Sequence, residues 1–354
     1  MAITYNTFED LWEHSEVLEG VHEVLREVAE ADGVAAISEA FVRGMNEDFG
    51  HKHVIAVSDE YGAEDAAKER VVGVLAMDPD LVIELAVAPE VRHRGVGIAL
   101  FEALRDQLGV SGAIDVWAHG DSAGAQRFVE SLNARRTREL LKMSLECLPA
   151  TKAAKTIEAE SAKAEELCEA HGIEVLSYNE SVARFDADAV DAEWVRVNNE
   201  AFAWHPEQGG WDVERLRAAR DTNWFDPDGV ILLWVRDQKS AVERVGIPCP
   251  AESAVEDANV YRLVGFHWTK IPVEEKEKES GQRVGEVYVV CLADDARGKG
   301  LGQAVTLLGM KLLVENGCGH IELYVEGDNA PAVSTYKYLG FEVVNTDVVY
   351  RGCL

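Results

Sequence analysis

The chain has 354 residues, and 64 acidic against 34 basic residues give it a formal net charge of −30. This length, with 47% hydrophobic residues, allows two domains with a core each, whereas the negative charge disfavours nucleic acids and anionic membrane surfaces as partners. The six cysteines form no C-x-x-C pair and no metal-ligand spacing, and the N-terminus lacks an apolar signal segment, so we expect a reduced, cytoplasmic protein without a metal.

Apolar periodicity in the first half predicts alternating helices and strands. In chain order the helices cover 18–31, 35–45, 98–107 and 123–132, and the strands cover 53–57, 71–77, 81–87 and 114–118. The third strand leads into a Gly-rich turn, Arg92-His93-Arg94-Gly95-Val96-Gly97, which directly precedes a predicted helix.

A stretch rich in Ala, Lys and Glu, with few large apolar residues, separates the two halves of the chain. This composition is typical of a solvated helix or linker. We therefore expect an N-terminal domain over residues 1–150, a linker or helix over 151–172, and a C-terminal domain over 173–354.

The second half repeats the order of the first. Helices are predicted over 189–202, 303–315 and 330–339, and strands over 230–235, 261–270, 285–292, 321–325 and 341–350. Two polar insertions, 237–260 and 273–282, are predicted to be surface loops without chemistry.

Each half carries one Gly-rich turn between a strand and a helix, the second being Arg297-Gly298-Lys299-Gly300-Leu301-Gly302. Such a turn presents several backbone N–H groups at a helix N-terminus, which favours a phosphate. The second turn is not a Walker loop, because no Gly-Lys-Ser/Thr ends it, and it lacks the Rossmann spacing.

A partner motif lies downstream of the second turn, with Asn329, Ala332, Tyr336 and Gly340-Phe341 in order. Together the two motifs resemble those of the GNAT family of acyl-CoA N-acyltransferases, and the resemblance covers both halves. It implies an α/β (α+β) fold of two tandem GNAT domains, each a mixed, mostly antiparallel sheet flanked by helices. It also implies acetyl-CoA as the co-substrate, with no metal.

Carried over by position, the resemblance assigns the CoA site in the second half. The pyrophosphate is expected on backbone N–H groups of the turn, and the pantetheine and acetyl carbonyl on the preceding strand end. Tyr336 is expected to protonate the departing CoA thiolate. The cofactor-binding residues are Val290, Cys291, Leu292, Arg297, Gly298, Lys299, Gly300, Leu301, Gly302, Gln303, Asn329, Ala330, Pro331, Ala332, Val333 and Ser334.

Further segments are similar to one family, the mycothiol acetyltransferases (mycothiol synthases), which are tandem GNAT enzymes. They are residues 198–211, 265–270 and 285–290, with Trp117-Ala118-His119-Gly120 and Asp32-Gly33-Val34-Ala35 in the first half. The resemblance implies acetyl transfer from acetyl-CoA to the cysteinyl amine of cysteinyl-glucosaminyl-inositol (desacetylmycothiol), the last step of mycothiol synthesis. It also implies that Glu39, Glu207, Lys270, Glu286 and Tyr324 contact this substrate, with Glu286 as the base for the ammonium.

The two halves differ at the positions that carry chemistry. Aligning the Gly-rich turns sets Leu81 opposite Glu286, and aligning the downstream motifs sets Val129 opposite Tyr336 and Trp117 opposite Tyr324. The first half keeps a candidate cradle for acetyl-CoA. Its residues are Leu85, Ala86, Val87, His93, Arg94, Gly95, Val96, Gly97 and Ile98. We therefore predict a non-catalytic first domain and a catalytic second domain.

Two alternatives remain open: a GNAT enzyme for another amine, such as a polyamine or a protein N-terminus, and a non-catalytic acetyl-CoA sensor. We expect a monomer that acts on a small-molecule amine. The paired His51 and His53 have no partner at ligand spacing, so they do not indicate a metal site. We expect His119, His205 and His267 to anchor turns or strands rather than act as bases.

Overall fold

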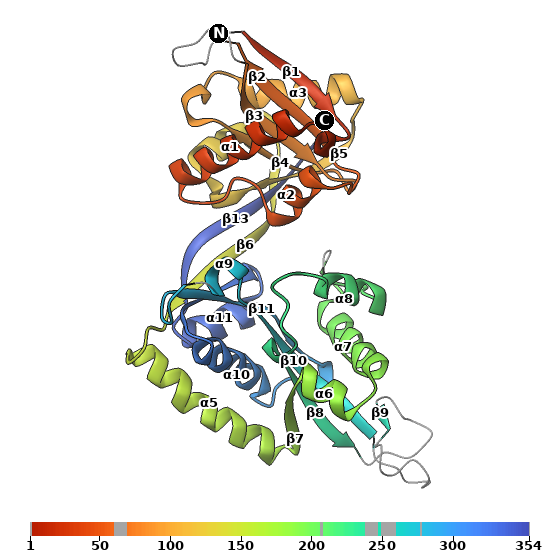
Figure 1. The fold of residues 1–354 in the computed structure, drawn as a ribbon, viewed down its shortest axis with the longest axis vertical. Helices are drawn as coiled ribbons and strands as arrows, with labels where there is room; N and C mark the ends of the chain where they lie inside the picture. Colours follow the sequence, from red (N-terminus) through yellow and green to blue (C-terminus); the bar gives the residue numbers. More distant parts are fainter. Residues whose placement is uncertain are drawn as a thin grey trace. The chain divides into compact units, whose positions relative to one another are not determined.

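The computed structural model describes residues 2–59, 69–205, 208–237, 247–248, 260–276 and 278–353. These residues form two compact units (Figure 1). The first contains Met1–Leu141, Glu326–Asn329 and Asn345–Leu354, and the second contains Lys142–Val325 and Ala330–Val344. The C-terminal residues therefore group with the first unit, whereas the stretch predicted as a linker or helix lies inside the second.

The first unit is built on a mixed, mostly antiparallel sheet, as its sequence pattern predicts. Its strands are β1 (Ile3–Phe8), β2 (Lys52–Ser58), β3 (Arg70–Met77), β4 (Val82–Val87), β5 (Ala113–Ala118) and the C-terminal part of β13 (Glu342–Cys353). They follow the order β1-β2-β3-β4-β5-β13. Only the β4–β5 pair is parallel among these neighbours.

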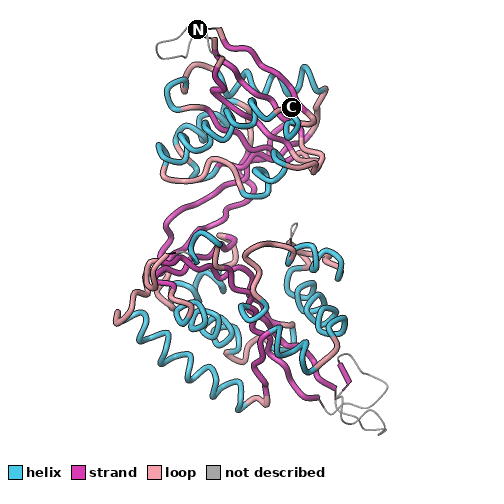
Figure 2. The backbone as a smooth tube through the Cα atoms, in the orientation of Figure 1, coloured by secondary structure: helices cyan, strands magenta, loops and turns pink. Residues whose placement is uncertain are grey.

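Helices cover this sheet (Figures 1 and 2). The α-helices are α1 (Ser15–Asp32), α2 (Glu39–Asn46), α3 (Val96–Leu108) and α4 (Ala123–Ser131), with short 3-10 turns at Leu11–Glu13, Pro89–Val91 and His119–Asp121. α1 packs on β3 and β4, and α3 packs on β1, β2 and β3. The apolar residues at helical spacing that predict α1, among them Val21, Val24 and Val28, are buried in the core.

The second unit repeats this plan with a longer sheet. Its strands are the C-terminal part of β6 (Arg135–Glu146), β7 (Ile173–Ser177), β8 (Val230–Asp237), β9 (Ile247–Pro248), β10 (Val260–Lys270), β11 (Arg283–Leu292) and β12 (Cys318–Glu326). The order is β6-β12-β11-β10-β8-β7, with β9 beside β10. β11 and β12 run parallel, whereas β10 runs antiparallel to both β11 and β8.

The helices of this unit are mostly those expected from the sequence. They are α5 (Lys152–Ala170), α6 (Tyr178–Arg184), α7 (Ala187–Phe202), α8 (Val213–Arg220), α9 (Val273–Lys276), α10 (Leu301–Glu315) and α11 (Ala330–Tyr338), with 3-10 turns at Pro227–Gly229 and Asp294–Ala296. The helix that was one of two forms expected over 151–172 is present as α5, but it is not solvated on all sides, because it packs on α10. Its Ile157, Ala164 and Cys168 are buried, and Ser161 Oγ donates to the carbonyl of Leu307, 3.1 Å away.

The two faces of the second sheet can be read from the end of β11. Val289 and Cys291 pack into the cluster built by Trp194 of α7, whereas Val290 and Leu292 pack with Leu301 and other residues of α10. Alternate residues of a strand point to opposite faces. One face of the sheet is therefore covered by α7 and the other by α10.

Candidate active site

A β-bulge interrupts β11 in the middle of the second unit. Trp268 of β10 pairs with Val289, but the next residue, Thr269, pairs with Val287. Tyr288 is thus the extra residue of a bulge, which bends the strand and increases its twist. On the other side, the register of β11 with β12 runs from the pair Arg283–Cys318 only as far as Val287–Leu323. The two parallel strands therefore diverge where the bulge begins.

The second Gly-rich turn lies immediately beyond this strand end. Gly298 and Gly300 adopt left-handed φ angles of +77° and +78°, which side chains with a Cβ rarely accept. Gly300 is the N-cap of α10 and leaves the first turn without a side-chain cap. Nothing lies within 4 Å of the position where a Cβ would stand on Gly298. The turn is therefore an open cradle of backbone N–H groups that fits a phosphate.

Helix α7 and strand β10 hold the start of this turn. The backbone N–H of Asp294 lies 3.4 Å from a carboxylate oxygen of Glu200 on α7. Arg262 of β10 donates to both carboxylate oxygens of Asp295, at 3.1 and 2.6 Å. Arg297 pairs with Asp294 at 3.1 Å. The turn is thus fixed by its neighbours rather than by contacts among its own glycines.

The strand end Val290-Cys291-Leu292 has no side chain suited to covalent chemistry. Val290 and Leu292 pack on the α10 face, and a Cβ built on Gly302 would stand 3.7 Å from Leu292 Cδ1. The Cys291 thiol points the other way, 4.0 Å from the carbonyl of Val197, and burial raises its pKa well above the usual value. What this strand end offers a ligand is its backbone.

Tyr336 lies on α11 and is 8% exposed. Its ring packs edge-on against Phe341 with centroids 5.8 Å apart. Burial raises its pKa to about 12, so the phenol is protonated at neutral pH. A protonated phenol is the form that can donate a proton to a leaving group. Asn329 precedes the helix in a turn, where its N–H donates to the carbonyl of Glu326.

Charged side chains gather where β11 begins to bulge. Lys270 and Glu286 are an in-register pair of β10 and β11, and Lys270 Nζ lies 4.0 Å from Glu286 Oε2. The ammonium of Lys270 also lies 5.0 Å from the ring centroid of Trp224 and 5.5 Å from that of Tyr288. The site thus holds a carboxylate and a cation against an aromatic surface.

Strand β12 adds Tyr324, whose side chain is 44% exposed. The ammonium of Lys142 on β6 lies 5.8 Å from the Tyr324 ring centroid and 2.7 Å from Glu322 Oε2. Glu322 in turn is the in-register neighbour of Glu286. The structure therefore groups three predicted residues, Lys270, Glu286 and Tyr324, with two that sequence reasoning missed. Glu322 stands two residues from Tyr324 on one strand face, which is a signal for it; Lys142 lies on a strand that was not predicted.

Asn198 and Asn199, near the end of α7, hold Gln208 and Trp211 by hydrogen bonds. Asn198 donates to the carbonyl of Gln208 at 2.7 Å, and Asn199 both donates to the carbonyl of Trp211 and accepts its N–H, at 2.7 and 2.9 Å. His205 Nδ1 accepts the N–H of Gln208, so this histidine anchors a turn as expected. Glu207 lies outside the described residues.

Glu39 is the first residue of α2 in the first unit and is exposed. The preceding residue, Ser38, donates its N–H to Glu84 Oε2 at 2.6 Å. This contact fixes the helix start but gives Glu39 no role, so its contact with substrate stays a prediction.

The first unit repeats the turn but not the bulge. His93 and Gly95 have φ angles of +60° and +84°, matching Gly298 and Gly300, and Gly95 likewise caps α3 without a side chain. The register of β3 with β4 is continuous from Gly73–Val87 to Met77–Ile83. Because no bulge intervenes, the residue equivalent to Glu286 is one position later than the sequence alignment indicates. It is Val82, which pairs with Asp115 as Glu286 pairs with Glu322, and not Leu81.

A buried ion cluster lies at the end of β5 in the first unit. His119 Nε2 is 3.3 Å from Glu84 and its Nδ1 is 3.3 Å from Asp347. Burial lowers the pKa of His119, but the two carboxylates outweigh it and raise the value to about 9. The N–H of Gly120 and the side chain of Asn345 also donate to Asp347, both at 2.8 Å. His119 is therefore an anchor, as expected, for residues of β13.

The other conspicuous histidines are also structural. His267 Nδ1 lies 3.0 Å from the carbonyl of Val305, and complete burial lowers the pKa of this histidine to about 4. His51 and His53 are buried side by side, with ring centroids 6.2 Å apart. In the part of the chain that the structure describes, no group of three His, Cys, Asp or Glu side chains is arranged to hold a metal ion.

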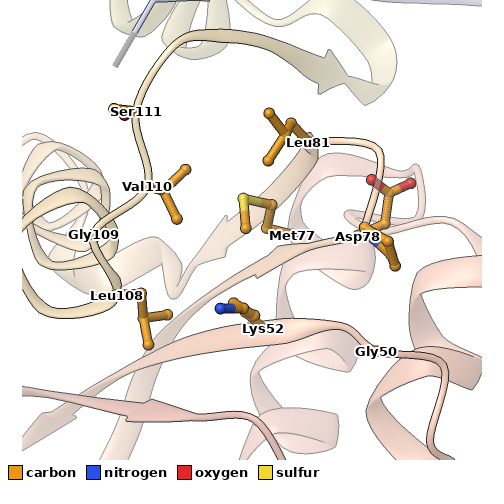
Figure 3. Close-up of a pocket in the computed structure, with 10 residues that line it drawn as sticks. Gly50, Lys52, Met77, Asp78, Leu81, Leu108, Gly109, Val110 and Ser111 are labelled. Carbon is orange, nitrogen blue, oxygen red and sulfur yellow. The ribbon is translucent and has the colours of Figure 1, made fainter.

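A pocket of about 320 Å³ lies in the first unit (Figure 3), and no residue of the Gly-rich turn is among those that line it. Lys52, Met77, Asp78 and Leu81 line it at the opposite end of β4. Lys52 pairs with Glu9 at 3.0 Å, and Asp78 accepts the N–H groups of Asp80 and Val82. These charges serve the local structure, and the pocket is not the predicted CoA site. No helix in the described ranges is long and apolar enough to span a bilayer.

Comparisons with known proteins agree with this geometry. The Acetyltransferase (GNAT) family pattern matches residues 198–341. A mycothiol acetyltransferase from Corynebacterium jeikeium is 77% identical over 354 residues, covering 100% of both chains. A second, from Corynebacterium urealyticum, is 51% identical over 361 residues and covers 99% of both. A solved tandem GNAT protein from the clavulanic acid biosynthesis pathway has a TM-score of 0.61 at 14% identity, covering 99% of this chain and 98% of its own.

The structural likeness at low identity establishes the tandem GNAT fold, and the two sequence relatives establish more, because they are similar over their whole length. The chain is an N-acetyltransferase of the GNAT fold and belongs to the mycothiol acetyltransferase family.

Proposed function

We propose that this protein transfers acetyl from acetyl-CoA to the cysteinyl amine of desacetylmycothiol, giving mycothiol, at one site in the second unit. The observation that carries the proposal is the pair Lys270–Glu286, set beside the bulge of β11 and upstream of the Gly-rich turn of the same unit. Glu286 of this pair provides a proton acceptor for an ammonium, and the Gly-rich turn before α10 provides a cradle for a pyrophosphate. Both belong to one sheet and its adjoining helix.

Acetyl-CoA binds in this proposal through the backbone. The open N–H groups from Arg297 to Gln303 hold the pyrophosphate, helped by the dipole of the 15-residue helix α10. Residues 330–334, the first turn of α11, and Asn329 before it contact the rest of the CoA. Val290-Cys291-Leu292 pairs with the pantetheine, since its side chains are committed to the two faces of the sheet.

Glu286 is the base. An ammonium has no lone pair, so the cysteinyl amine must lose a proton before it attacks the acetyl carbonyl carbon. The carboxylate of Glu286 accepts this proton through a water molecule. Lys270 Nζ lies 4.0 Å from Glu286 Oε2, so a cation stands beside this carboxylate.

Attack forms a C–N bond and a tetrahedral intermediate whose negative oxygen accepts a backbone N–H from the end of β11. The C–S bond then breaks, and the electron pair leaves on the CoA sulfur. Tyr336 donates its phenolic proton to that sulfur, which suits a buried tyrosine that is protonated at working pH. The nitrogen gives its second proton to water and becomes a neutral amide, and the phenolate that Tyr336 becomes when it protonates the sulfur regains a proton from water.

The remaining substrate contacts follow from the family. Lys270 and Tyr324 lie on neighbouring strands on either side of Glu286 and offer a donor and a hydroxyl to the pseudodisaccharide. Glu207 and Glu39 are proposed to contact the same substrate.

The first unit is proposed to hold acetyl-CoA without transferring its acetyl group. Its turn has the same backbone conformation as the second, with Leu85-Ala86-Val87 as the strand end. Val82 and Val129 stand where a base and an acid are needed, and neither titrates. Its role is therefore structural.

We also infer that the enzyme works as a monomer in the cytoplasm, without nucleic acid, membrane or metal. Free thiols at Cys147, Cys168, Cys291, Cys318 and Cys353 suit a reducing compartment. Size-exclusion chromatography with light scattering tests the monomer directly.

The experiment mixes purified protein with acetyl-CoA and desacetylmycothiol and follows free CoA together with the N-acetyl product by mass spectrometry. Spermidine and a short peptide with a free N-terminus serve as competing amines. We expect turnover on desacetylmycothiol to exceed that on either amine. Turnover on the other amines alone would refute the substrate assignment, and acetyl-CoA binding without any turnover would indicate a sensor.

A further inference from the structure

Four charged side chains form a row across four neighbouring strands of the second unit. Lys270 of β10 and Glu286 of β11 are register partners, and Glu286 is in turn the register partner of Glu322 of β12. Lys142 of β6 closes the row, with its Nζ 2.7 Å from Glu322 Oε2. The order along the row is cation, carboxylate, carboxylate, cation.

The middle of this row carries an electrostatic problem. Neighbouring strands lie about 4.8 Å apart, and register partners point to the same face, so Glu286 and Glu322 project from adjacent strands on one face of the sheet. Like charges on neighbouring side chains repel, so an uncompensated carboxylate on Glu322 disfavours a charged carboxylate on Glu286. A protonated Glu286 is unable to accept a proton from an ammonium.

Lys142 compensates the negative charge of Glu322 by pairing with it. Its side chain is 26% exposed, so the ion pair is screened less than a pair on the open surface. Burial disfavours the ammonium, but hydrogen bonding to Glu322 and attraction from Tyr324 and Glu286 prevail and raise the pKa of Lys142. The lysine is therefore charged throughout the neutral range.

We propose that Lys142 and Glu322 are a positioning pair for the base: Lys142 neutralises Glu322, so that Glu286 remains the charged carboxylate that takes the proton of the amine. The pair touches neither substrate nor CoA in this proposal and acts only through Glu286. It rests on the proposed function, in which Glu286 is the base.

The other charged or titratable groups around Glu286 do not perform this task. Lys270 Nζ on β10 lies 4.0 Å from the Glu286 carboxylate. Tyr288 is two residues after Glu286 on β11, and Tyr324 is two residues after Glu322 on β12. Glu275 of α9 is engaged with the N–H of Val284 at 2.9 Å and with Lys278 at 2.6 Å. Among these described neighbours Lys142 is the cation bound to Glu322.

The test is the pH profile of kcat/KM for desacetylmycothiol, measured under saturating acetyl-CoA. Lys142→Met keeps the aliphatic stem but leaves Glu322 uncompensated, so the acidic limb moves up by about half to one pH unit. Glu322→Gln removes the competing carboxylate, so the limb moves down. In the double variant, Lys142→Met with Glu322→Gln, the acidic limb returns close to its wild-type position. Lys142→Arg keeps the wild-type limb.

Opposite shifts from the two single variants are not expected from general damage to the fold. Lys163→Met is the matched control, because Lys163 makes a 2.6 Å ion pair with Glu160 on α5, and its limb stays in place. Acetyl-CoA affinity, measured by calorimetry, stays within about twofold of wild type in every variant.

Unmoved limbs in both Lys142→Met and Glu322→Gln overturn the positioning pair, as do shifts of the same sign. If the limb is at the same time lost in Glu286→Gln, the proposed function stands and only this inference fails. If the wild type does not acetylate the substrate, both fail. If Lys142→Met does not fold, Glu322→Gln and Lys142→Arg still test the proposal. A downward shift of the acidic limb in Glu322→Gln, with no shift in Lys142→Arg, supports the positioning pair.

Discussion

Lys270 Nζ lies 4.0 Å from Glu286 Oε2, and the two residues are register partners on β10 and β11. The pair lies directly before the bulge at Tyr288, where β11 and β12 diverge. A charged carboxylate is thus fixed by backbone hydrogen bonding on both of its neighbouring strands. Its position depends on the sheet rather than on a mobile loop, which is what precise proton transfer requires.

Replacing Glu286 by Gln is expected to lower kcat/KM by about 10²–10⁴-fold, because the amide is unable to accept the proton of the ammonium. The acidic limb contributed by the enzyme disappears, while titration of the substrate amine remains. Acetyl-CoA binding is unchanged. The measurement is the pH profile of kcat/KM, with Glu315→Gln at the exposed end of α10 as the control. A variant that keeps the wild-type profile would exclude Glu286 as the base.

Replacing Tyr336 by Phe is expected to lower kcat with little change in acetyl-CoA affinity, since the hydroxyl acts only when the thiolate leaves. Its pKa is raised to about 12 by burial, so wild-type activity shows no tyrosine limb below about pH 10. Tyr338→Phe is the matched control, because this tyrosine is two residues further on the same helix and is 76% exposed. Equal kcat in both variants would remove Tyr336 as the acid.

The cluster around His119 predicts a pH dependence of stability. The folded pKa of His119 is about 9 against an ordinary 6.5, so its stabilisation is complete below about pH 6.5 and disappears as pH rises through 9. Burial opposes ionisation of Asp347, but its bonds to His119 and Gly120 prevail and lower its pKa. Its contribution is therefore present above its ordinary pKa and lost as pH falls through the lowered value.

Asp347→Asn should cost on the order of 3 kcal/mol of unfolding free energy near pH 6 and much less near pH 10. Urea denaturation at both pH values measures this. The matched control is Asp115→Asn, which removes the ion pair of Asp115 on β5 with Arg351 on β13, at 2.5 Å. Because arginine does not titrate in this range, the control should lose equal stability at both pH values. An equal loss in Asp347→Asn would contradict the assignment.

Apolar periodicity was sufficient for most helices and strands, and its failures have physical reasons. The run Val287-Tyr288-Val289-Val290 is apolar throughout, so the bulge leaves no break in the alternation, and the equivalent of Glu286 was placed at Leu81 rather than Val82. β13 is one continuous strand, and its sequence pattern does not reveal which sheet its last residues join.

The candidate site was only partly accessible from the sequence. The left-handed conformations of Gly95, Gly298 and Gly300 follow from the composition of the turns, since glycine accepts this φ. The φ of +60° at His93 does not follow from it. Lys142, by contrast, becomes relevant only when β6 is paired with β12, a contact between distant segments that no local pattern encodes. The same holds for the buried face of α5, which a few small apolar residues form against α10.

The most direct measurement is the production of N-acetylated product from desacetylmycothiol by the wild type, Gly95→Ala and Gly300→Ala, side by side. Both substitutions place a Cβ in a left-handed conformation, at φ of +84° and +78°, which costs about 1–2 kcal/mol locally. We predict wild-type kcat for Gly95→Ala, and at least about a tenfold loss of kcat/KM for acetyl-CoA in Gly300→Ala. Two results would contradict a single active site in the second unit. One is wild-type turnover by Gly300→Ala, and the other is turnover that is lost in Gly95→Ala but kept in Gly300→Ala.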